Sequence, residues 1–149
     1  MTTKKKVYLA SFLAPMLIML VAWIIDGFFP FGAKSLMAVD FNAQYIGLYA
    51  YFKHLFLNGD WSSFFYSFSK SIGGGMLGIW GFNLLSPFNF LFLLFSEENF
   101  QWVVPVTIAL RYGTMGLTMT HFLVKRYDGL KKKAYLLPIV ATIYALNGF

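Results

Sequence analysis

The chain alternates between long apolar runs and mixed segments, and two of the runs are long enough to cross a lipid bilayer. Residues 7–25 are apolar except for Ser11, and a helix over them would measure about 28 Å, close to the hydrocarbon core of a bilayer. Residues 102–124 form a second run of about 34 Å. Residues 134–149 begin a third run that reaches about 24 Å, so we expect only the start of a span.

Residues 26–101 are too polar and too interrupted for one span, and we expect them to form an extracytoplasmic loop. Apolar residues recur there at helical spacing, which predicts an amphipathic helix ending at the turn signal of residues 58–60. This stripe consists of Phe41, Tyr45, Leu48, Phe52 and Leu55. Glycines and Ser86-Pro87 interrupt residues 72–95. A full crossing by residues 76–95 would carry the later basic cluster outside, so we predict a re-entrant or surface-lying pair of short helices.

The distribution of basic residues predicts how these apolar runs are oriented across a membrane. Eight of the twelve basic residues form two clusters, at residues 4–6 and 125–133, and each cluster borders a long apolar run. Cationic flanks stay on the cytoplasmic side, so we predict a cytoplasmic N-terminus and a cytoplasmic loop at 125–133. The lysines before the first run resemble the start of a signal peptide, but no small-residue cleavage site follows, which favours an uncleaved anchor. The same placement argues against nucleic acid as a partner.

Composition excludes a water-soluble globule. Hydrophobic residues make up 58% of the chain and charged residues 12%, whereas soluble domains average about 45–50% and about 25%. Aromatic residues reach 21%, and Trp and Tyr favour the headgroup region of a bilayer. Cysteine is absent, which excludes disulfides and thiol nucleophiles. We therefore predict an all-α, polytopic integral membrane protein consisting of a single membrane module.

Three motifs in order carry a family resemblance along nearly the whole chain. They are residues 37–45 (MAVDFNAQY), 65–75 (FYSFSKSIGGG) and 84–89 (LLSPFN). Together they resemble the N-terminal part of the bacterial YfhO family of large polytopic membrane proteins. Members of that family are several times longer, so we expect this chain to be a truncated fragment. The resemblance also implies a multi-pass protein of the bacterial cell membrane.

The YfhO family is similar to membrane glycosyltransferases that use polyprenyl-phosphate sugars. The resemblance implies transfer of a sugar from such a donor to a cell-envelope glycopolymer, for example lipoteichoic acid. An acid in the first extracytoplasmic loop serves catalysis in such enzymes, and the matching residue here is Asp40. As a base it would take the proton of the acceptor hydroxyl. Asp40 could instead cap the helix that begins at Phe41, and the two roles can coexist.

Four further residues are candidates for substrate binding. Gln44 and Tyr45 lie about one helical turn after Asp40 and could contact the sugar or the acceptor, although interfacial tyrosines are common. Lys70 precedes a glycine triplet whose bare amides could approach a phosphate, although the triplet could equally be a hinge. Arg111 lies inside an apolar run, where an ionised group faces protein or a watery cavity. It could bind the donor phosphate or pair with an acid.

No metal site is evident from spacing. His54 and His121 stand alone, so we predict no zinc. Asp26, Asp40 and Asp60 could hold a divalent cation, but their spacing does not require one. A second reading of the whole chain is a non-catalytic small membrane protein that binds lipid or the membrane helices of a partner. The incomplete third run favours that reading, because its apolar faces need other helices to cover them.

Overall fold

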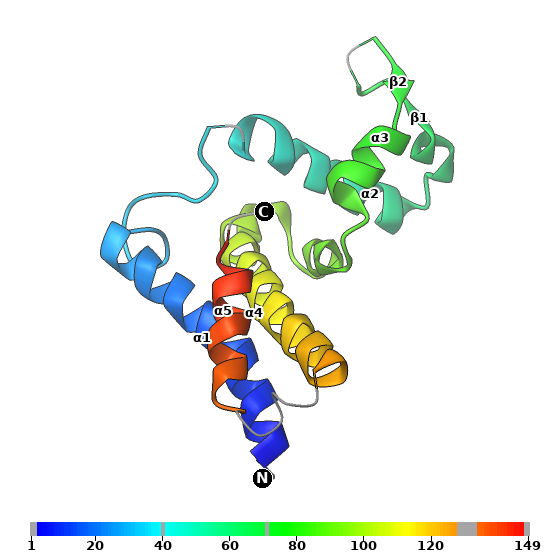
Figure 1. Cartoon of the computed structure of the whole chain (residues 1–149). Helices are drawn as coiled ribbons and strands as arrows, with labels where there is room; N and C mark the ends of the chain where they lie inside the picture. Colours follow the sequence, from blue (N-terminus) through cyan, green and yellow to red (C-terminus); the bar gives the residue numbers. More distant parts are fainter. Residues whose placement is uncertain (1–2, 40, 71, 128–133, 148–149) are drawn as a thin grey trace. The chain divides into compact units, whose positions relative to one another are not determined.

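The computed structural model describes residues 3–39, 41–70, 72–127 and 134–147, which are mostly helical (Figure 1). The chain divides into two compact units. The terminal unit combines residues 1–34 with residues 108–149, and the central unit consists of residues 35–107.

Three helices build the terminal unit. Helix α1 (Thr3–Asp26) contains the predicted first span, α4 (Phe100–Arg126) enters the unit at Ile108, and α5 (Leu136–Ala145) packs against α1. The three helices lie side by side (Figure 1).

Small residues allow α1 and α4 to approach closely. A Cβ atom on Gly116 would overlap the backbone carbonyl oxygen of Ser11, so any side chain there would force the helices apart. One turn further along α4, the hydroxyl of Thr120 donates to Ser11 Oγ at 2.6 Å, and both residues are fully buried. Small interfacial residues joined by interhelical hydrogen bonds are typical of helix pairs in membranes. The one polar residue of the first apolar run therefore has a structural role.

The two helices run antiparallel, and this brings the basic clusters together. Tyr8 of α1 meets His121 of α4 edge to face, with ring centroids 6.4 Å apart. Residues 4–6 and the basic end of α4, residues 125–126, therefore lie at the same end of the helix pair. Asp26 ends α1 about 30 Å away, one hydrocarbon thickness. This is the arrangement that the positive-inside pattern requires, whereas the cytoplasmic orientation itself stays a prediction.

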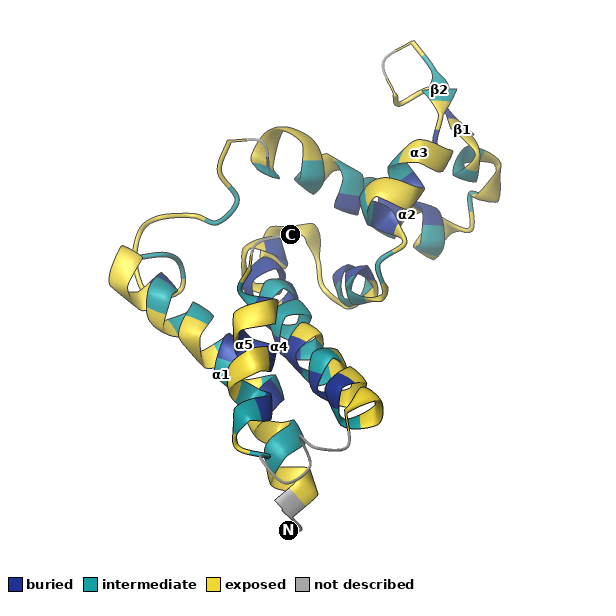
Figure 2. Ribbon diagram, in the orientation of Figure 1, coloured by how far each residue is buried: buried dark blue, intermediate teal, exposed yellow. Residues whose placement is uncertain are grey.

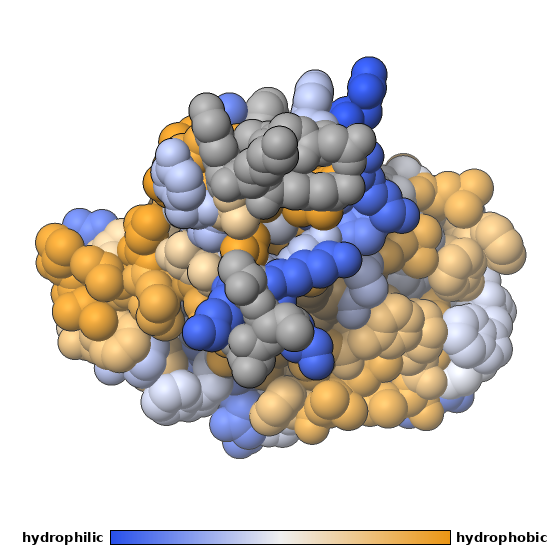
Figure 3. All heavy atoms as spheres, turned by 60° about the horizontal axis from the view of Figure 1, so that its bottom comes forward, coloured by the Kyte–Doolittle hydropathy of each residue, from blue (hydrophilic) through white to orange (hydrophobic). Residues whose placement is uncertain are grey.

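Among the described helices, α1 alone is both long and apolar enough to cross a membrane as a single element. The helices at 77–84 and 87–94 are together long and apolar enough for a second span, but they are bent by 89° relative to each other. Helix α4 has the length, but its threonines, Arg111 and His121 lower its mean hydropathy. The span over residues 102–124 therefore stays a prediction. Broad hydrophobic areas nevertheless reach the surface of the molecule (Figure 3).

The central unit is a chain of short elements between α1 and α4. In order these are the π-helix η1 (Phe41–Tyr45), α2 (Ile46–Asn58), η2 (Trp61–Phe64), β1 (Tyr66–Ser67), β2 (Gly74–Gly75), α3 (Leu77–Ile79), the π-helix η3 (Trp80–Leu84), η4 (Pro87–Leu94) and η5 (Glu97–Asn99). Strands β1 and β2 pair antiparallel. This hairpin departs from the predicted all-α fold. Each strand has two residues, which is too few for a sequence pattern to identify.

The core of the central unit is aromatic. Buried positions of the central unit include one face of α2 (Figure 2). Phe52, Trp80 and Phe92 are fully buried, and Tyr49 stacks on Phe92 with centroids 4.1 Å apart. The predicted stripe holds along α2 at Phe52 and Leu55. Earlier in α2 the stripe differs from the prediction, because Tyr49 is buried in place of Leu48, which is half-buried. The buried position moves from Leu48 to Tyr49 because η1 precedes it, and a π turn contains about one more residue than an α turn.

A buried amide fixes the bend between the two short helices at 77–84 and 87–94. Asn89 is fully buried, and its Nδ2 donates to the backbone carbonyls of Asn83 and Leu84 at 2.7 and 3.1 Å. These carbonyls end η3, where helix geometry leaves acceptors without partners. Two short helices thus lie within residues 76–95, whereas their re-entrant or surface-lying position stays a prediction.

Candidate functional site

Both π-helices contribute to one pocket of the central unit. Single π turns are rare and occur frequently at functional sites, because the extra residue re-aims the side chains around it. Helix η1 supplies Ala43 and Gln44, and η3 supplies Phe82. Two residues of the predicted motif at residues 37–45, Ala43 and Gln44, therefore line this pocket.

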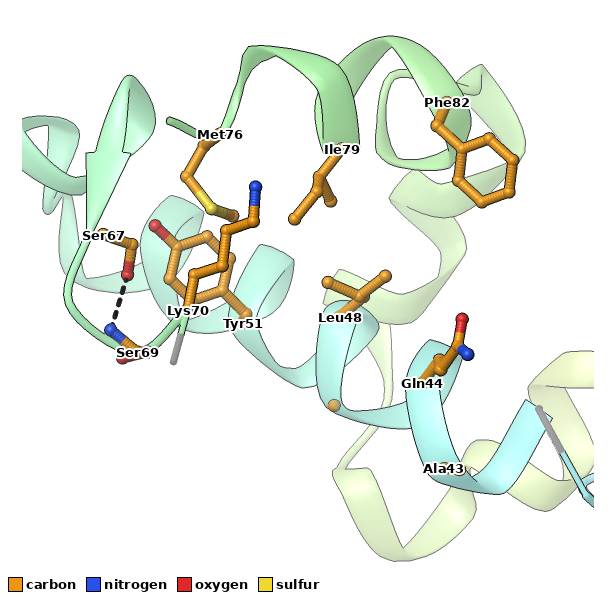
Figure 4. Close-up of a pocket in the computed structure, with 11 residues that line it drawn as sticks. Ala43, Gln44, Leu48, Tyr51, Ser67, Ser69, Lys70, Met76, Ile79 and Phe82 are labelled. Atoms are coloured by element: carbon orange, nitrogen blue, oxygen red, sulfur yellow. Dashed lines mark hydrogen bonds between the residues drawn. The ribbon is translucent and has the colours of Figure 1, made fainter. Parts of the chain in front are cut away.

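The pocket has a volume of about 680 Å³, within the usual range for a small-molecule site. Helix α2 and the hairpin complete its walls (Figure 4). The lining residues are Ala43, Gln44, Gly47, Leu48, Tyr51, Ser67, Ser69, Lys70, Met76, Ile79 and Phe82. Apolar atoms make up most of the lining surface, and the polar groups come from η1, α2 and the hairpin.

Lys70 supplies the positive charge of the pocket. Its side chain extends into the pocket (Figure 4), and its Nζ donates to the carbonyl of Gly75 at 2.9 Å. An ammonium has three donors, so this bond leaves capacity for a ligand oxygen. No carboxylate belongs to the lining set, and Lys70 is the one charged residue in the sequence between Asp60 and Glu97. The electrostatics therefore favour an anion.

Serine and tyrosine hydroxyls surround this charge. Ser67 is buried, and its Oγ accepts the backbone amide of Ser69 at 3.2 Å, which holds the start of the hairpin loop. The hydroxyl of Tyr51 donates to the carbonyl of Ser63 and ties α2 to η2. A lysine, an amide and hydroxyls beside an apolar floor suit a ligand that joins a phosphate or sugar to a hydrocarbon chain.

The structure brings two of the five predicted site residues together, since Gln44 and Lys70 line the same pocket. Tyr45 does not belong to the lining set. Its ring packs between Phe41 and Phe82, with centroids 5.4 and 6.3 Å away, which is a packing role. Asp40 lies outside the described residues and directly precedes η1 in the sequence.

Arg111 belongs to the terminal unit and not to this pocket. It lies on α4, two residues before Gly113, and it is half-buried, with its Nε atom buried. A half-buried guanidinium inside a helix of this kind indicates a protein-facing position. Its contact with the donor phosphate stays a prediction.

Several lining residues were not predicted from the sequence. Tyr51 and Gly47 lie on the helix face of Gln44, at spacings of seven and three residues, and this periodicity could have revealed them. The serines of the hairpin carried no such signal, because their place depends on pairing between β1 and β2. Phe82 reaches the pocket only through the π geometry of η3.

The described residues contain no group of three His, Asp or Glu side chains that could hold a metal ion. Asp60 accepts the hydroxyls of Ser62 and Ser63 at the start of η2. These hydrogen bonds hold the pKa of the Asp60 carboxyl below its usual value of 3.8. The Asp60 carboxylate therefore holds the side chains of Ser62 and Ser63 together in the turn after α2.

The long apolar helix, the small-residue helix contact and the exposed hydrophobic areas are typical of helical membrane proteins. A family model described as "Bacterial membrane protein YfhO" matches residues 11–149. The chain therefore belongs to the YfhO family, as the motifs at residues 37–45, 65–75 and 84–89 predicted. Comparison with the curated proteins gave no match, and neither did comparison with the solved structures.

Proposed function

We propose that this chain forms part of a membrane glycosyltransferase that takes its sugar from a polyprenyl-phosphate donor. The observation that carries the proposal is the pocket of the central unit, which combines Lys70 and Gln44 with an apolar floor. A polyprenyl-phosphate sugar has the same three parts, namely an anionic phosphate, a hydroxyl-rich sugar and a hydrocarbon chain.

In the proposed reaction, the acceptor hydroxyl attacks the anomeric carbon of the donor sugar. The bond from that carbon to the phosphate oxygen breaks, and the polyprenyl phosphate leaves with the bonding electrons. Asp40 takes the hydroxyl proton, and Lys70 stabilises the charge that develops on the departing phosphate. Gln44 contacts the sugar. Arg111, in the terminal unit, stays a separate candidate for binding the donor phosphate.

The family resemblance supports an envelope glycopolymer such as lipoteichoic acid as the acceptor. Such an acceptor is reached from the outer face of the membrane. The common end of the basic clusters supports this orientation, because it allows residues 4–6 and 125–126 to stay cytoplasmic together. The central unit follows the opposite end of α1 in the sequence and would then lie on the outer side.

Donor binding can be tested with a photoreactive polyprenyl-phosphate analogue in membranes containing the protein. Lys70→Gln removes a charge-assisted hydrogen bond of about 1.5–3 kcal/mol, so the apparent Kd should rise at least about tenfold. Lys53→Gln is the matched control, because Lys53 lies in the same unit and donates to the carbonyl of Phe95 without lining the pocket. Equal labelling of the two variants would exclude Lys70 as the phosphate partner.

A second candidate function is a non-catalytic membrane protein that binds lipid or the helices of a partner. The exposed apolar side chains of α1 favour it, since Leu17, Val21 and Ile25 are more than half exposed. Large exposed apolar surfaces mark contact with lipid or protein. Sugar transfer lost on Asp40→Asn separates the two candidates, because lipid or helix binding does not need that carboxylate.

A further inference from the structure

The loop of the β1–β2 hairpin presents apolar side chains that the central unit does not cover. Ile72 is 94% exposed and Phe68 is 79% exposed. The ring of Tyr66 meets the ring of Phe68 edge to face, with centroids 5.3 Å apart. Gly73 has a φ of 108°, and a Cβ there would collide with the Tyr66 ring, so glycine allows the chain to turn tightly beneath this aromatic pair.

The charge around this loop suits a membrane surface. The loop's one charged residue, Lys70, turns back to the Gly75 carbonyl, so the apolar tip is formed by Phe68 and Ile72. No acidic residue occurs in the sequence from residue 61 to residue 96. A lysine that turns away from an apolar tip resembles the way lysines near lipid keep their charge at the headgroup level. Aromatic residues such as Tyr66 also favour that level.

We propose that the hairpin tip, defined as Phe68 and Ile72, inserts into the interfacial region of a lipid bilayer. The tip then lies at the boundary between headgroups and acyl chains, with Tyr66 and Lys70 at the headgroup level. Exposed apolar side chains gain free energy in proportion to the area removed from water, which gives the insertion its driving force. The inference rests on membership of a membrane family and does not depend on the proposed reaction.

Insertion of the hairpin tip would also determine the position of the pocket relative to the membrane. Ser67, Ser69 and Lys70 lie on the hairpin and also line the pocket. Insertion of the tip therefore holds one wall of the pocket at the height of lipid phosphates. A lipid-linked ligand would enter sideways from the leaflet, without leaving the membrane.

The chain contains no cysteine, so a single introduced cysteine can be labelled specifically. Ile72→Cys, labelled with an environment-sensitive fluorophore, is reconstituted in vesicles of phosphatidylcholine and phosphatidylglycerol. Glu98→Cys is the matched control, because Glu98 is an exposed polar position of the same unit. Quenching is then measured with doxyl-labelled lipid and with aqueous iodide. Because the Ile72 side chain is almost fully exposed, its replacement removes no packing contact that folding needs.

We expect the label at position 72 to lose emission with doxyl lipid, to resist iodide and to emit at shorter wavelength than the label at position 98. Phe68→Cys should behave as position 72 does. Quenching of position 72 by iodide as strong as that of position 98 would overturn the proposal in favour of a water-exposed loop. Protection from both quenchers would overturn it in favour of a protein partner over the tip. Since no turnover is measured, these outcomes stay separate from failure of sugar transfer.

Discussion

The contact between α1 and α4 can be tested by the smallest change, Gly116→Ala. A Cβ atom at this position overlaps the carbonyl oxygen of Ser11 and meets the Pro15 ring at 3.1 Å. A backbone carbonyl cannot move aside as a flexible side chain can, so relief of the overlap requires the helices to separate by about 1 Å. That movement would lengthen the 2.6 Å bond between Thr120 and Ser11 beyond normal hydrogen-bond range.

Two effects of Gly116→Ala lower the stability of the helix pair, and one raises it. Overpacking of a tight interface costs about 1–3 kcal/mol, and an interhelical hydrogen bond in a membrane is worth about 0.6 kcal/mol. Alanine recovers about 0.8–1.0 kcal/mol, because it favours the helical backbone more than glycine does. We therefore expect a net loss of about 0.6–2.8 kcal/mol in the stability of the helix pair.

Two measurements check this loss. The first is the free energy of unfolding in detergent micelles titrated with a denaturing detergent. The second uses the absence of cysteine, with Tyr8→Cys and His121→Cys introduced together as a reporter of helix proximity. A short thiol crosslinker should join this pair efficiently in the parent chain and poorly after Gly116→Ala.

The matched control is Gly81→Ala, because a Cβ atom there meets nothing within 4 Å. This control should leave both the unfolding free energy and the crosslinking yield unchanged or slightly raised. If Gly116→Ala behaves like Gly81→Ala, the helices do not meet at this glycine, and the argument from small-residue packing is refuted.

Three other predictions concern single side chains. Arg111→Leu should weaken labelling by the photoreactive donor if the guanidinium binds phosphate, whereas unchanged labelling would indicate a structural role. Asn89→Ala leaves the carbonyls at the end of η3 without their side-chain donor. It should cost about 1–3 kcal/mol, seen as a lower denaturation midpoint, and an unchanged midpoint would show that the bend does not need the amide. The lowered pKa of Asp60 predicts stability that is present above pH 3.8 and lost as the pH falls through the lowered value. Asp60→Asn should abolish that acid dependence in a pH series of unfolding curves, and persistence of the dependence would assign it to another group.

Local sequence patterns predicted the long helix and the motif positions, because both depend on residues close together in the chain. The apolar run at residues 7–25 lies within α1, and Gly59, with a φ of 67°, ends α2 at the predicted turn. Gln44 and Lys70 were also predicted as site residues, and the structure places both on one pocket. The sequence indicated each residue separately, whereas their common location depends on how the hairpin lies against η1 and α2.

Features that depend on tertiary packing were not predicted. The π turn at Phe41–Tyr45 moves Tyr49 into the core, where it stacks on Phe92, and this gain from a distant residue is invisible to local periodicity. The glycine triplet was interpreted as a hinge or a phosphate contact, whereas its second and third residues form β2. Strand pairing with Tyr66–Ser67 needs partners seven and nine residues away, and two-residue strands are too short for local periodicity to detect.

The most direct test of the account is sugar transfer in membranes from a radiolabelled polyprenyl-phosphate sugar. The assay compares this chain and a full-length member of the YfhO family, each with and without Asp40→Asn at the matching position. We predict transfer by the full-length protein that is abolished by Asp40→Asn, with expression and membrane insertion unchanged. Undiminished transfer after Asp40→Asn would contradict the assignment of Asp40 as the base. A lack of transfer by the unaltered full-length protein from every polyprenyl-phosphate sugar tested would contradict the proposed function itself.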